Sequence, residues 1–181
     1  MGFLVRAGLP EKDVTERIRS SGVRWFSLYL HQDPDIINDV LGMPRVPDDY
    51  RTFIGDVLGC GGRVLPHISA GYGRADFRMC ADLLEELGVG EVVLDTAVPV
   101  PGSCLEESCL TSDAVAECAS VLVSEGFDVC LGHCRDMSLD GLEMKCAEAG
   151  VRRFQSPSAE FARFLEEEDI ERCGSESCIP F

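Results

Sequence analysis

Short apolar segments alternate with longer amphipathic segments along nearly the whole chain. Glycine, proline or charged residues bound each apolar segment, as they commonly bound buried strands. The apolar segments are Gly2–Ala7, Val23–Leu30, Arg63–Ser69, Glu91–Val98, Phe127–Gly132 and Val151–Gln155. We therefore expect six strands, with connections between them that are long enough to hold a helix each.

The connections carry apolar residues three and four positions apart, which is the period of a helix packed on a sheet. In one of them Phe77, Cys80, Leu84 and Leu87 form a single stripe. Side chains that can accept hydrogen bonds from the amides of a first helical turn precede or open several connections. The candidate caps are Asp48 and Asp49, Thr111, Ser112 and Asp113, Ser138, and Ser156 and Ser158.

Two architectures accommodate six strand–helix units, an open doubly wound sheet and a barrel. No GxGxxG or GxxxxGK motif follows any predicted strand. Polar residues stand at strand ends instead, and a barrel gathers the carboxyl ends of its strands around one mouth. These residues are His31, His67, Asp95, His133 and Gln155. We predict an α/β fold, an incomplete TIM-like (βα)6 barrel with parallel strands, in which residues 1–168 form a single domain and residues 169–181 a cysteine-containing C-terminal tail.

The charge of the chain argues against two classes of partner. The formal net charge is −16 and the isoelectric point is about 4.4. Nucleic acids and anionic membranes are bound mainly through lysine and arginine, so neither is an expected partner. No apolar run approaches the roughly 18 residues that a membrane-spanning helix needs. Because the N-terminus resembles a first strand more than a signal peptide, we expect a cytoplasmic protein.

The chain contains ten cysteines, a high count for 181 residues. Without an export signal, reduced thiols are a better interpretation than a disulfide framework. Thiolates and imidazoles also suit zinc or an iron–sulfur cluster. The candidate metal ligands are Cys130 and Cys134, beside His133 at the end of the fifth strand, and Cys173 and Cys178 in the tail. Strand alternation separates His133 from both neighbouring cysteines unless the chain turns after Gly132. Buried or solvent-facing thiols are the alternative interpretation.

Three strand-end residues are candidates for catalysis. His67 alternates with Leu65 and Ser69, so it should face the barrel interior, either as a general base or as a hydrogen-bonded core histidine. Asp95 ends an apolar run, where a carboxylate needs a compensating partner, and this makes it a candidate site residue. His133, at the end of the fifth strand, is the third candidate.

Three stretches of the chain point to one family. They are DPDIINDVLGMPRVPDDYRTFIGDVLGCGGRVLPHISAG, VVLDTAVPVPGS and LGHCRDMSLDGLEMKCAEAGVRRFQSPS. Together they resemble biotin-synthase-like radical SAM proteins. The first is similar to that family's segment ending in G-x-x-V-x-P-H-I-x-x-G, the second to its sixth strand and proline-rich turn, and the third to its seventh and eighth strands. The resemblance runs from about Gly2 to Glu168.

The resemblance implies that the six strands are the third to eighth of a (βα)8 barrel. It also implies the remnant of a pocket lined by His67, by the turn Val98–Gly102 and by further cofactor-binding candidates. These candidates are Gly71, Gly73, Pro99, Pro101, Gly102 and Arg135. No cysteine triplet has the CxxxCxxC spacing of the family's cluster motif. The cofactor is therefore unknown, with an iron–sulfur cluster or zinc favoured over S-adenosylmethionine.

These observations favour an accessory or non-catalytic radical-SAM-like barrel protein that completes its fold or site with a partner chain or by self-association. The unpaired edges of an incomplete barrel motivate this expectation. The expected partner is a second copy of the chain or a radical-SAM-type protein. Two alternatives stay open: a metal- or iron–sulfur-dependent enzyme that uses strand-end histidine and aspartate with loop cysteines, and a small-molecule-binding module.

Overall fold

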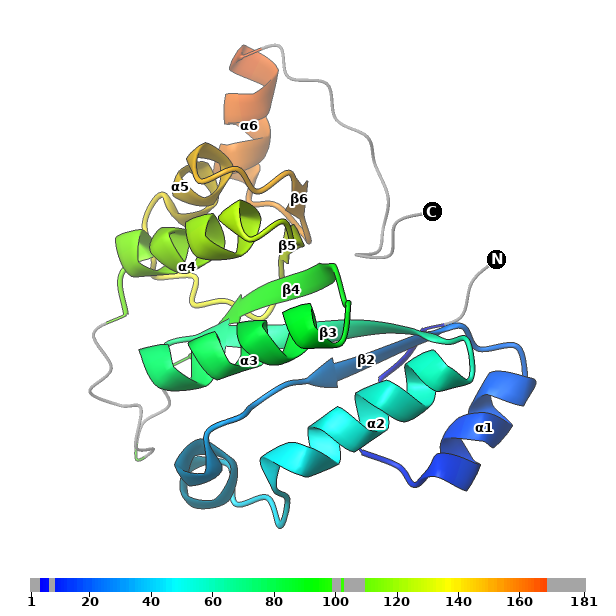
Figure 1. The fold of residues 1–181 in the computed structure, drawn as a ribbon. Helices are drawn as coiled ribbons and strands as arrows, with labels where there is room; N and C mark the ends of the chain where they lie inside the picture. The colour runs from blue at the N-terminus through cyan, green and yellow to red at the C-terminus, as the bar shows by residue number, and fades with distance from the viewer. Residues whose placement is uncertain (1–3, 7–8, 99–101, 103–109, 169–181) are drawn as a thin grey trace. The chain divides into compact units, whose positions relative to one another are not determined.

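A computed structural model of the chain describes residues 4–6, 9–98, 102 and 110–168 (Figure 1). The chain forms two compact units, Met1–Val92 and Val93–Phe181. Each unit alternates strands with helices, as the apolar pattern predicts. The prediction that residues 1–168 form a single domain stays a prediction.

The first unit contains three strands that pair in chain order. They are β1 (Leu4–Arg6), β2 (Trp25–Tyr29) and β3 (Arg63–Ala70). Both pairs are parallel, with Leu4 opposite Trp25 and Tyr29 opposite His67. The helices are α1 (Lys12–Ser20), α2 (Pro47–Gly59) and α3 (Arg74–Glu86), together with a π-helical turn at Ile36–Val40. Both α2 and α3 pack on β3.

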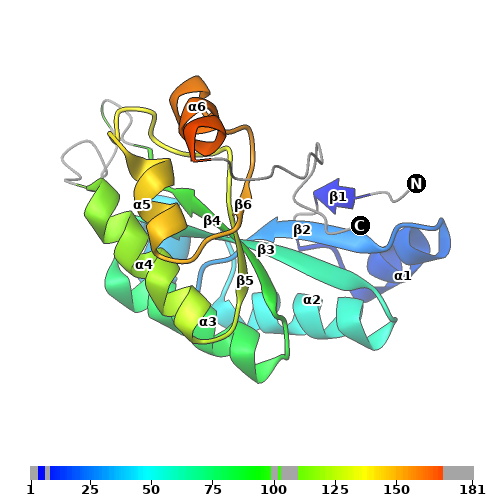
Figure 2. The ribbon, with the colours of Figure 1, turned by 90° about the horizontal axis from the view of Figure 1, so that it is seen from above.

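The second unit repeats this alternation. Its strands are β4 (Glu91–Thr96), which begins just before the boundary, β5 (Asp128–Leu131) and β6 (Arg153–Phe154). Its helices are α4 (Ser112–Ser124), α5 (Leu142–Glu148) and α6 (Ala159–Glu167). Beyond the end of β5, the N–H of Gly132 donates to the Leu94 carbonyl of β4 at 2.8 Å. Strands β5 and β6 are parallel, and α4 lies beside α5 (Figure 2).

The six predicted strands are confirmed, and so are two of the predicted helix caps. The Thr111 side chain accepts the N–H of Ala114 at the start of α4, and Ser158 does the same for Phe161 at the start of α6. Ser138 as a helix cap is wrong. Its N–H and hydroxyl donate to Asp136 in a preceding turn. The helix α5 begins only after Gly141, whose positive φ of 65° is not helical.

The core of each unit is built from strands that are buried on both faces. Four consecutive residues of β2, Trp25–Leu28, are buried, and Val92, Val93 and Leu94 of β4 are fully buried. Continuous burial of this kind is typical of parallel strands covered by helices. Each such large apolar side chain contributes about 1.5–3 kcal/mol by leaving water. Cys80 and Cys146 are buried on helix faces.

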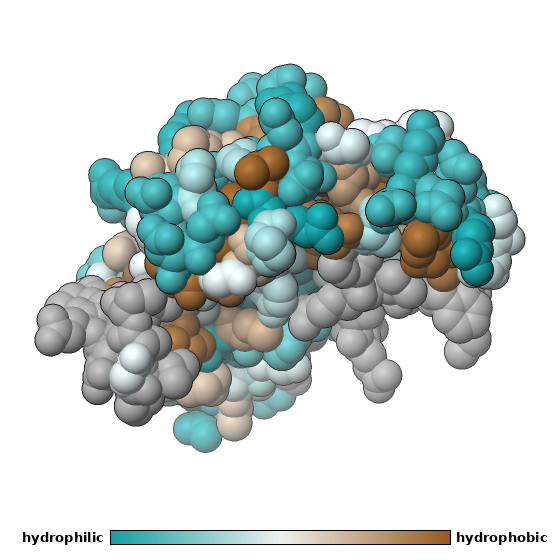
Figure 3. All heavy atoms as spheres, turned by 90° about the horizontal axis from the view of Figure 1, so that it is seen from below, coloured by the Kyte–Doolittle hydropathy of each residue, from teal (hydrophilic) through white to brown (hydrophobic). Residues whose placement is uncertain are grey.

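The surface carries both hydrophilic and apolar residues (Figure 3). Figure 3 shows hydrophilic residues over much of the face seen from below, with separate apolar spots between them. No helix in the described part of the chain is long and apolar enough to span a bilayer.

Candidate functional site

Each unit carries a group of polar side chains where its parallel strands end. In the first unit the group centres on His31, which lies two residues after the end of β2 and is 4% exposed. Its Nδ1 lies 2.9 Å from Oδ2 of Asp76, in the first turn of α3. The other oxygen of Asp76 accepts the backbone N–H groups of Gln32 at 2.6 Å and Asp33 at 2.8 Å. The carboxylate thus fixes both the imidazole and the loop after β2.

The charge state of Asp76 determines the tautomer of His31. Burial works to raise the pKa of Asp76, but the hydrogen bonds from His31 and from the amides of Asp33 and Gln32 hold this pKa below its ordinary value. An ionised carboxylate only accepts hydrogen bonds, so Nδ1 of His31 carries the proton. Nε2 then keeps a lone pair with which to accept a proton or bind a polar group. The ring of Tyr72 lies edge-on to the imidazole at 5.1 Å.

Two ionisable side chains near this pair, Tyr50 and Cys80, are uncharged at neutral pH. Burial raises the pKa of Tyr50 to about 12, with further contributions from Cys80 and Asp76. Burial also raises the pKa of the Cys80 thiol, which donates to the Leu30 carbonyl at 3.5 Å. Both groups therefore stay protonated at neutral pH, and Cys80 is not a nucleophile.

His67 is buried in β3, 5% exposed, and its ring centroid lies 5.2 Å from that of Tyr29 on β2. Gly71 and Gly73 form the turn from β3 into α3 with positive φ values of 109° and 129°, which favour glycine. This turn carries Tyr72 to the His31 ring and places Asp76 in the first turn of α3. The catalytic role predicted for His67 and the cofactor role predicted for both glycines stay predictions.

Sequence reasoning noticed His31 as a strand-end residue but missed Asp76. An aspartate just inside a helix is read from sequence as a favourable charge near the positive end of the helix dipole. Only the tertiary structure shows that this carboxylate reaches back to a strand end. The neighbouring Asp33 forms a local turn, since its Oδ1 accepts the N–H of Asp35 at 2.9 Å.

The second unit holds the other candidates. Asp95 of β4 is 1% exposed and lies against Gly132, where an added Cβ would overlap the carboxylate. Beside it, the Thr96 hydroxyl accepts the N–H of Asp136 at 2.7 Å, and the Thr96 N–H donates to the Cys134 carbonyl at 2.9 Å. These bonds tie the loop that follows β5 to the end of β4.

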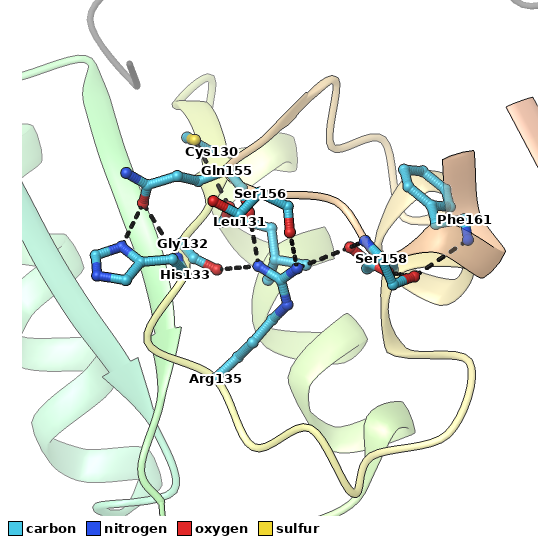
Figure 4. A network of polar contacts seen from close by, with 10 residues as sticks. Cys130, Leu131, Gly132, His133, Arg135, Gln155, Ser156, Ser158 and Phe161 are labelled. Carbon is cyan, nitrogen blue, oxygen red and sulfur yellow. Dashed lines mark hydrogen bonds and ion pairs between the residues drawn. The ribbon is translucent and has the colours of Figure 1, made fainter. Parts of the chain in front are cut away.

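Arg135 is buried below this loop and bonded to protein groups (Figure 4). It donates to Oε1 of Glu143 at 2.8 Å and to three backbone carbonyls. The carbonyls are those of Gly132 at 2.5 Å, Gln155 at 2.8 Å and Ser156 at 2.7 Å. Glu143 also accepts the hydroxyl and the N–H of Ser158. In the structure Arg135 acts as a clamp between the segments that follow β5 and β6, and the cofactor contact predicted for it stays a prediction.

Above the clamp, the chain turns after Gly132 and brings His133 and Cys134 together. The Cys134 Sγ lies 3.4 Å from Nε2 of His133, and Nδ1 of His133 lies 2.7 Å from Oε1 of Gln155. His133 is exposed, whereas Cys134 and Gln155 are half-buried. The thiol of Cys134 therefore contacts the imidazole of His133, which in turn contacts the amide oxygen of Gln155, just beyond the ends of β5 and β6.

Of the four metal ligands predicted from the sequence, two are among the residues that the structure describes and two are not. Cys130 is buried in β5, 1% exposed. Within residues 4–6, 9–98, 102 and 110–168, no group of three or more histidine, cysteine, aspartate or glutamate side chains is arranged to hold a metal ion. Cys173 and Cys178 lie outside the described residues, as do Pro99 and Pro101. Gly102 is exposed with a φ of 80°. The described residues alone do not fit zinc or an iron–sulfur cluster.

A cavity of about 180 Å³ lies beside the clamp, between α5, the start of α6 and the loop before α5. Arg135, Glu143, Ser158 and Phe161 are among its lining residues. Sites for drug-sized ligands usually measure about 300–1,000 Å³, so this cavity suits water or a very small molecule.

Comparison with known proteins shows which folds the chain resembles. No family model matches the chain, and a search of curated proteins finds no significant match. Several solved structures are similar, among them the following three. Methylornithine synthase matches with 16% identity and a TM-score of 0.64, over 86% of this chain and 47% of its own length. Hydroxymethylglutaryl-CoA lyase from Pseudomonas aeruginosa matches with 16% identity and a TM-score of 0.63, over 94% and 64%. A DHODH from Eimeria tenella matches with 11% identity and a TM-score of 0.51, over 92% and 59%.

At these identities the likeness concerns the fold alone. The chain spans about half the length of methylornithine synthase, 47%, and 64% of the lyase. The chain therefore has the predicted α/β fold, an incomplete TIM-like barrel.

Proposed function

We propose that the chain is an accessory barrel subunit of the biotin-synthase-like radical SAM type, which completes its fold or its site with a partner chain or a second copy of itself. The observation that carries the proposal is the state of the terminal strands. Among the described residues, β1 pairs only with β2 and β6 pairs only with β5. A closed barrel leaves no edge, because every strand has a neighbour on both sides.

One backbone amide marks the outer edge of β6, the side that faces away from β5. The N–H of Gln155 donates to the Leu131 carbonyl of β5 at 2.8 Å. Backbone groups of successive residues in a parallel strand point to opposite sides, so the N–H of Phe154 points away from β5. An added strand would pair with this amide. The described cysteines are thiols, which fits the reducing cytoplasm that we propose as the compartment.

Light scattering at micromolar concentration, combined with amide hydrogen exchange, tests the proposal. We expect a stable dimer or a stoichiometric complex, in which the Phe154 amide exchanges slowly. The Gln155 amide is the matched control, since it is bonded within the chain and should be protected in every state. A monomer without a stoichiometric partner, in which Phe154 exchanges fast beside a protected Gln155, contradicts the proposal.

The His31–Asp76 pair favours a second candidate, a small-molecule-binding or catalytic module in the first unit. A buried imidazole held by a carboxylate, with Nε2 left to accept a proton, is a common arrangement for a general base. Ligand-dependent shifts in melting temperature test this candidate, with His31→Ala as the comparison. We expect a small molecule to raise the melting temperature of the native protein more than that of His31→Ala, and equal shifts in the two proteins argue against this candidate.

A further inference from the structure

We propose that Cys134 is a nucleophilic thiol, with His133 as its general base and Gln155 as the residue that positions the imidazole. This inference goes beyond the accessory role and does not depend on a partner. The three residues come from two loops: His133 and Cys134 follow β5, and Gln155 directly follows β6. In TIM-like folds the segments after the carboxyl ends of strands are where reactive groups gather.

A backbone amide fixes the orientation of the Gln155 side chain. The main-chain N–H of His133 donates to Gln155 at 3.1 Å, so the atom that faces it must be the acceptor oxygen Oε1. The same oxygen lies 2.7 Å from Nδ1 of the His133 ring (Figure 4). Since Oε1 only accepts, Nδ1 carries the proton. The lone pair of the neutral ring is therefore on Nε2.

Nε2 faces the thiol. The distance of 3.4 Å between Cys134 Sγ and His133 Nε2 is within reach of a hydrogen bond from S–H to the ring. A nucleophile bonded to a base, with a third group that orients the base, is the arrangement by which thiol and hydroxyl nucleophiles are activated. Cys134 is half-buried and His133 exposed, so a reagent in solution can reach the pair.

The Arg135 clamp holds both loops in place. Nη1 of Arg135 donates to the carbonyl of Gly132, just before His133, and to the carbonyl of Gln155 itself. Its side chain is only 4% exposed, and it pairs with Glu143, whose side chain is 10% exposed. The base and its positioning residue therefore rest on a rigid, buried support, as a preorganised site requires.

Other cysteines of the chain serve as internal references. Cys60 is half-buried like Cys134, but its thiol donates to the Val57 carbonyl at 3.2 Å. Burial raises the pKa of Cys146 to about 12, so its thiolate is scarce at neutral pH. Cys60 is thus the matched comparison for exposure, and Cys146 marks the unreactive limit.

Acyl exchange with a small thioester is a reaction by which the nucleophilic character of this pair can be probed. The thiol proton of Cys134 passes to Nε2 of His133, and the sulfur forms a bond to the carbonyl carbon of the thioester. The carbon–sulfur bond to the leaving thiolate then breaks, and that thiolate takes the proton from Nε2. One thioester and one thiol enter and leave, so no oxidant or other co-reactant is needed.

Peptide-resolved alkylation of the full chain with iodoacetamide measures the reactivity of each thiol. At about pH 7 we expect Cys134 to react roughly tenfold faster than Cys60, less than the 10²–10⁴ of an enclosed general base because His133 is exposed to water. His133→Ala should bring Cys134 down to the rate of Cys60. Gln155→Leu should slow it, and Gln155→Glu, which keeps an acceptor in place, should restore it.

A second assay tests the acyl step. The probe is the S-acetyl thioester of N-acetylcysteamine, and mass spectrometry locates the acetyl group. We expect S-acetylation at Cys134 that His133→Ala abolishes while circular dichroism shows an unchanged fold. Equal alkylation of Cys134 and Cys60, or a Cys134 rate that is insensitive to His133→Ala, overturns the proposal. Fast alkylation without acetylation overturns the thioester step.

Discussion

The buried pair of Arg135 and Glu143 offers the sharpest test of how the second unit is held together. Their side chains are 4% and 10% exposed. Replacing Arg135 with Met keeps an unbranched side chain but removes the charge. The carboxylate of Glu143 then stays buried with Ser158 as its remaining hydrogen-bond partner, and three backbone carbonyls lose a donor.

Removing one member of a buried ion pair costs about 3–5 kcal/mol. Total stabilities are about 5–15 kcal/mol, so the loss is a large share of the whole. At about 2–4 °C per kcal/mol for a chain of this size, the melting temperature should fall by roughly 6–20 °C. Urea and thermal unfolding, followed by far-ultraviolet circular dichroism, measure the change in the free energy of unfolding.

The matched control is Arg51→Met. Arg51 also pairs with a glutamate, Glu86, but the two side chains are 42% and 61% exposed, so solvent screens the pair and stability should hardly change. Combining Arg135→Met with Glu143→Gln removes the buried charge and should recover part of the loss. A cost below about 1 kcal/mol for Arg135→Met, or a double variant no better than the single one, would refute the reasoning.

Other expectations follow from the same structure. Asp76→Asn should lower the free energy of unfolding by about 1–3 kcal/mol at neutral pH. The pKa of Asp76 lies below its ordinary value of 3.8, so the native protein loses this stabilisation as the pH falls below about 4. The difference in unfolding free energy between the variant and the native protein should therefore shrink in acid. Tyr50→Phe should be neutral or stabilising by up to about 1 kcal/mol, since the hydroxyl is buried without a hydrogen-bond partner among the described residues. The native protein, but not this variant, should lose stability from the tyrosine as the pH rises from 10 to about 12. Gly132→Ala should cost about 1–3 kcal/mol because its Cβ would overlap Asp95, whereas Gly90→Ala, with open space around it, should cost less. Iron, zinc and acid-labile sulfide assays on protein purified without oxygen test the predicted cysteine ligands, and stoichiometric metal is expected only if the tail contributes.

The sequence located the strands because burial on both faces leaves a local mark. Runs such as Val92–Leu94 are apolar without interruption, and glycines end the helices between them. Caps such as Thr111 and Ser158 were also visible, since a cap bonds an amide only three residues ahead. The prediction for Ser138 was wrong because Ser138 belongs to a turn in which it donates to Asp136, and the helix begins only after Gly141.

The candidate sites were only half visible from the sequence. Strand-end polarity identified His31 and His133, but not the groups that orient them. Asp76 is 45 positions from His31, and Gln155 is 22 positions from His133. No periodicity relates such pairs, because they meet only when neighbouring strand–helix units are packed together.

The sequence by itself determined the order of strands and helices, the α/β class and the acidic, thiol-rich character of the chain. These properties depend on which residues are apolar and on contacts within a few positions. The tertiary structure decided that Asp76 holds His31, that Arg135 clamps two loops, and that a turn after Gly132 brings Cys134 to His133. Each of these depends on the distance between side chains on separate segments, and that distance is set by packing.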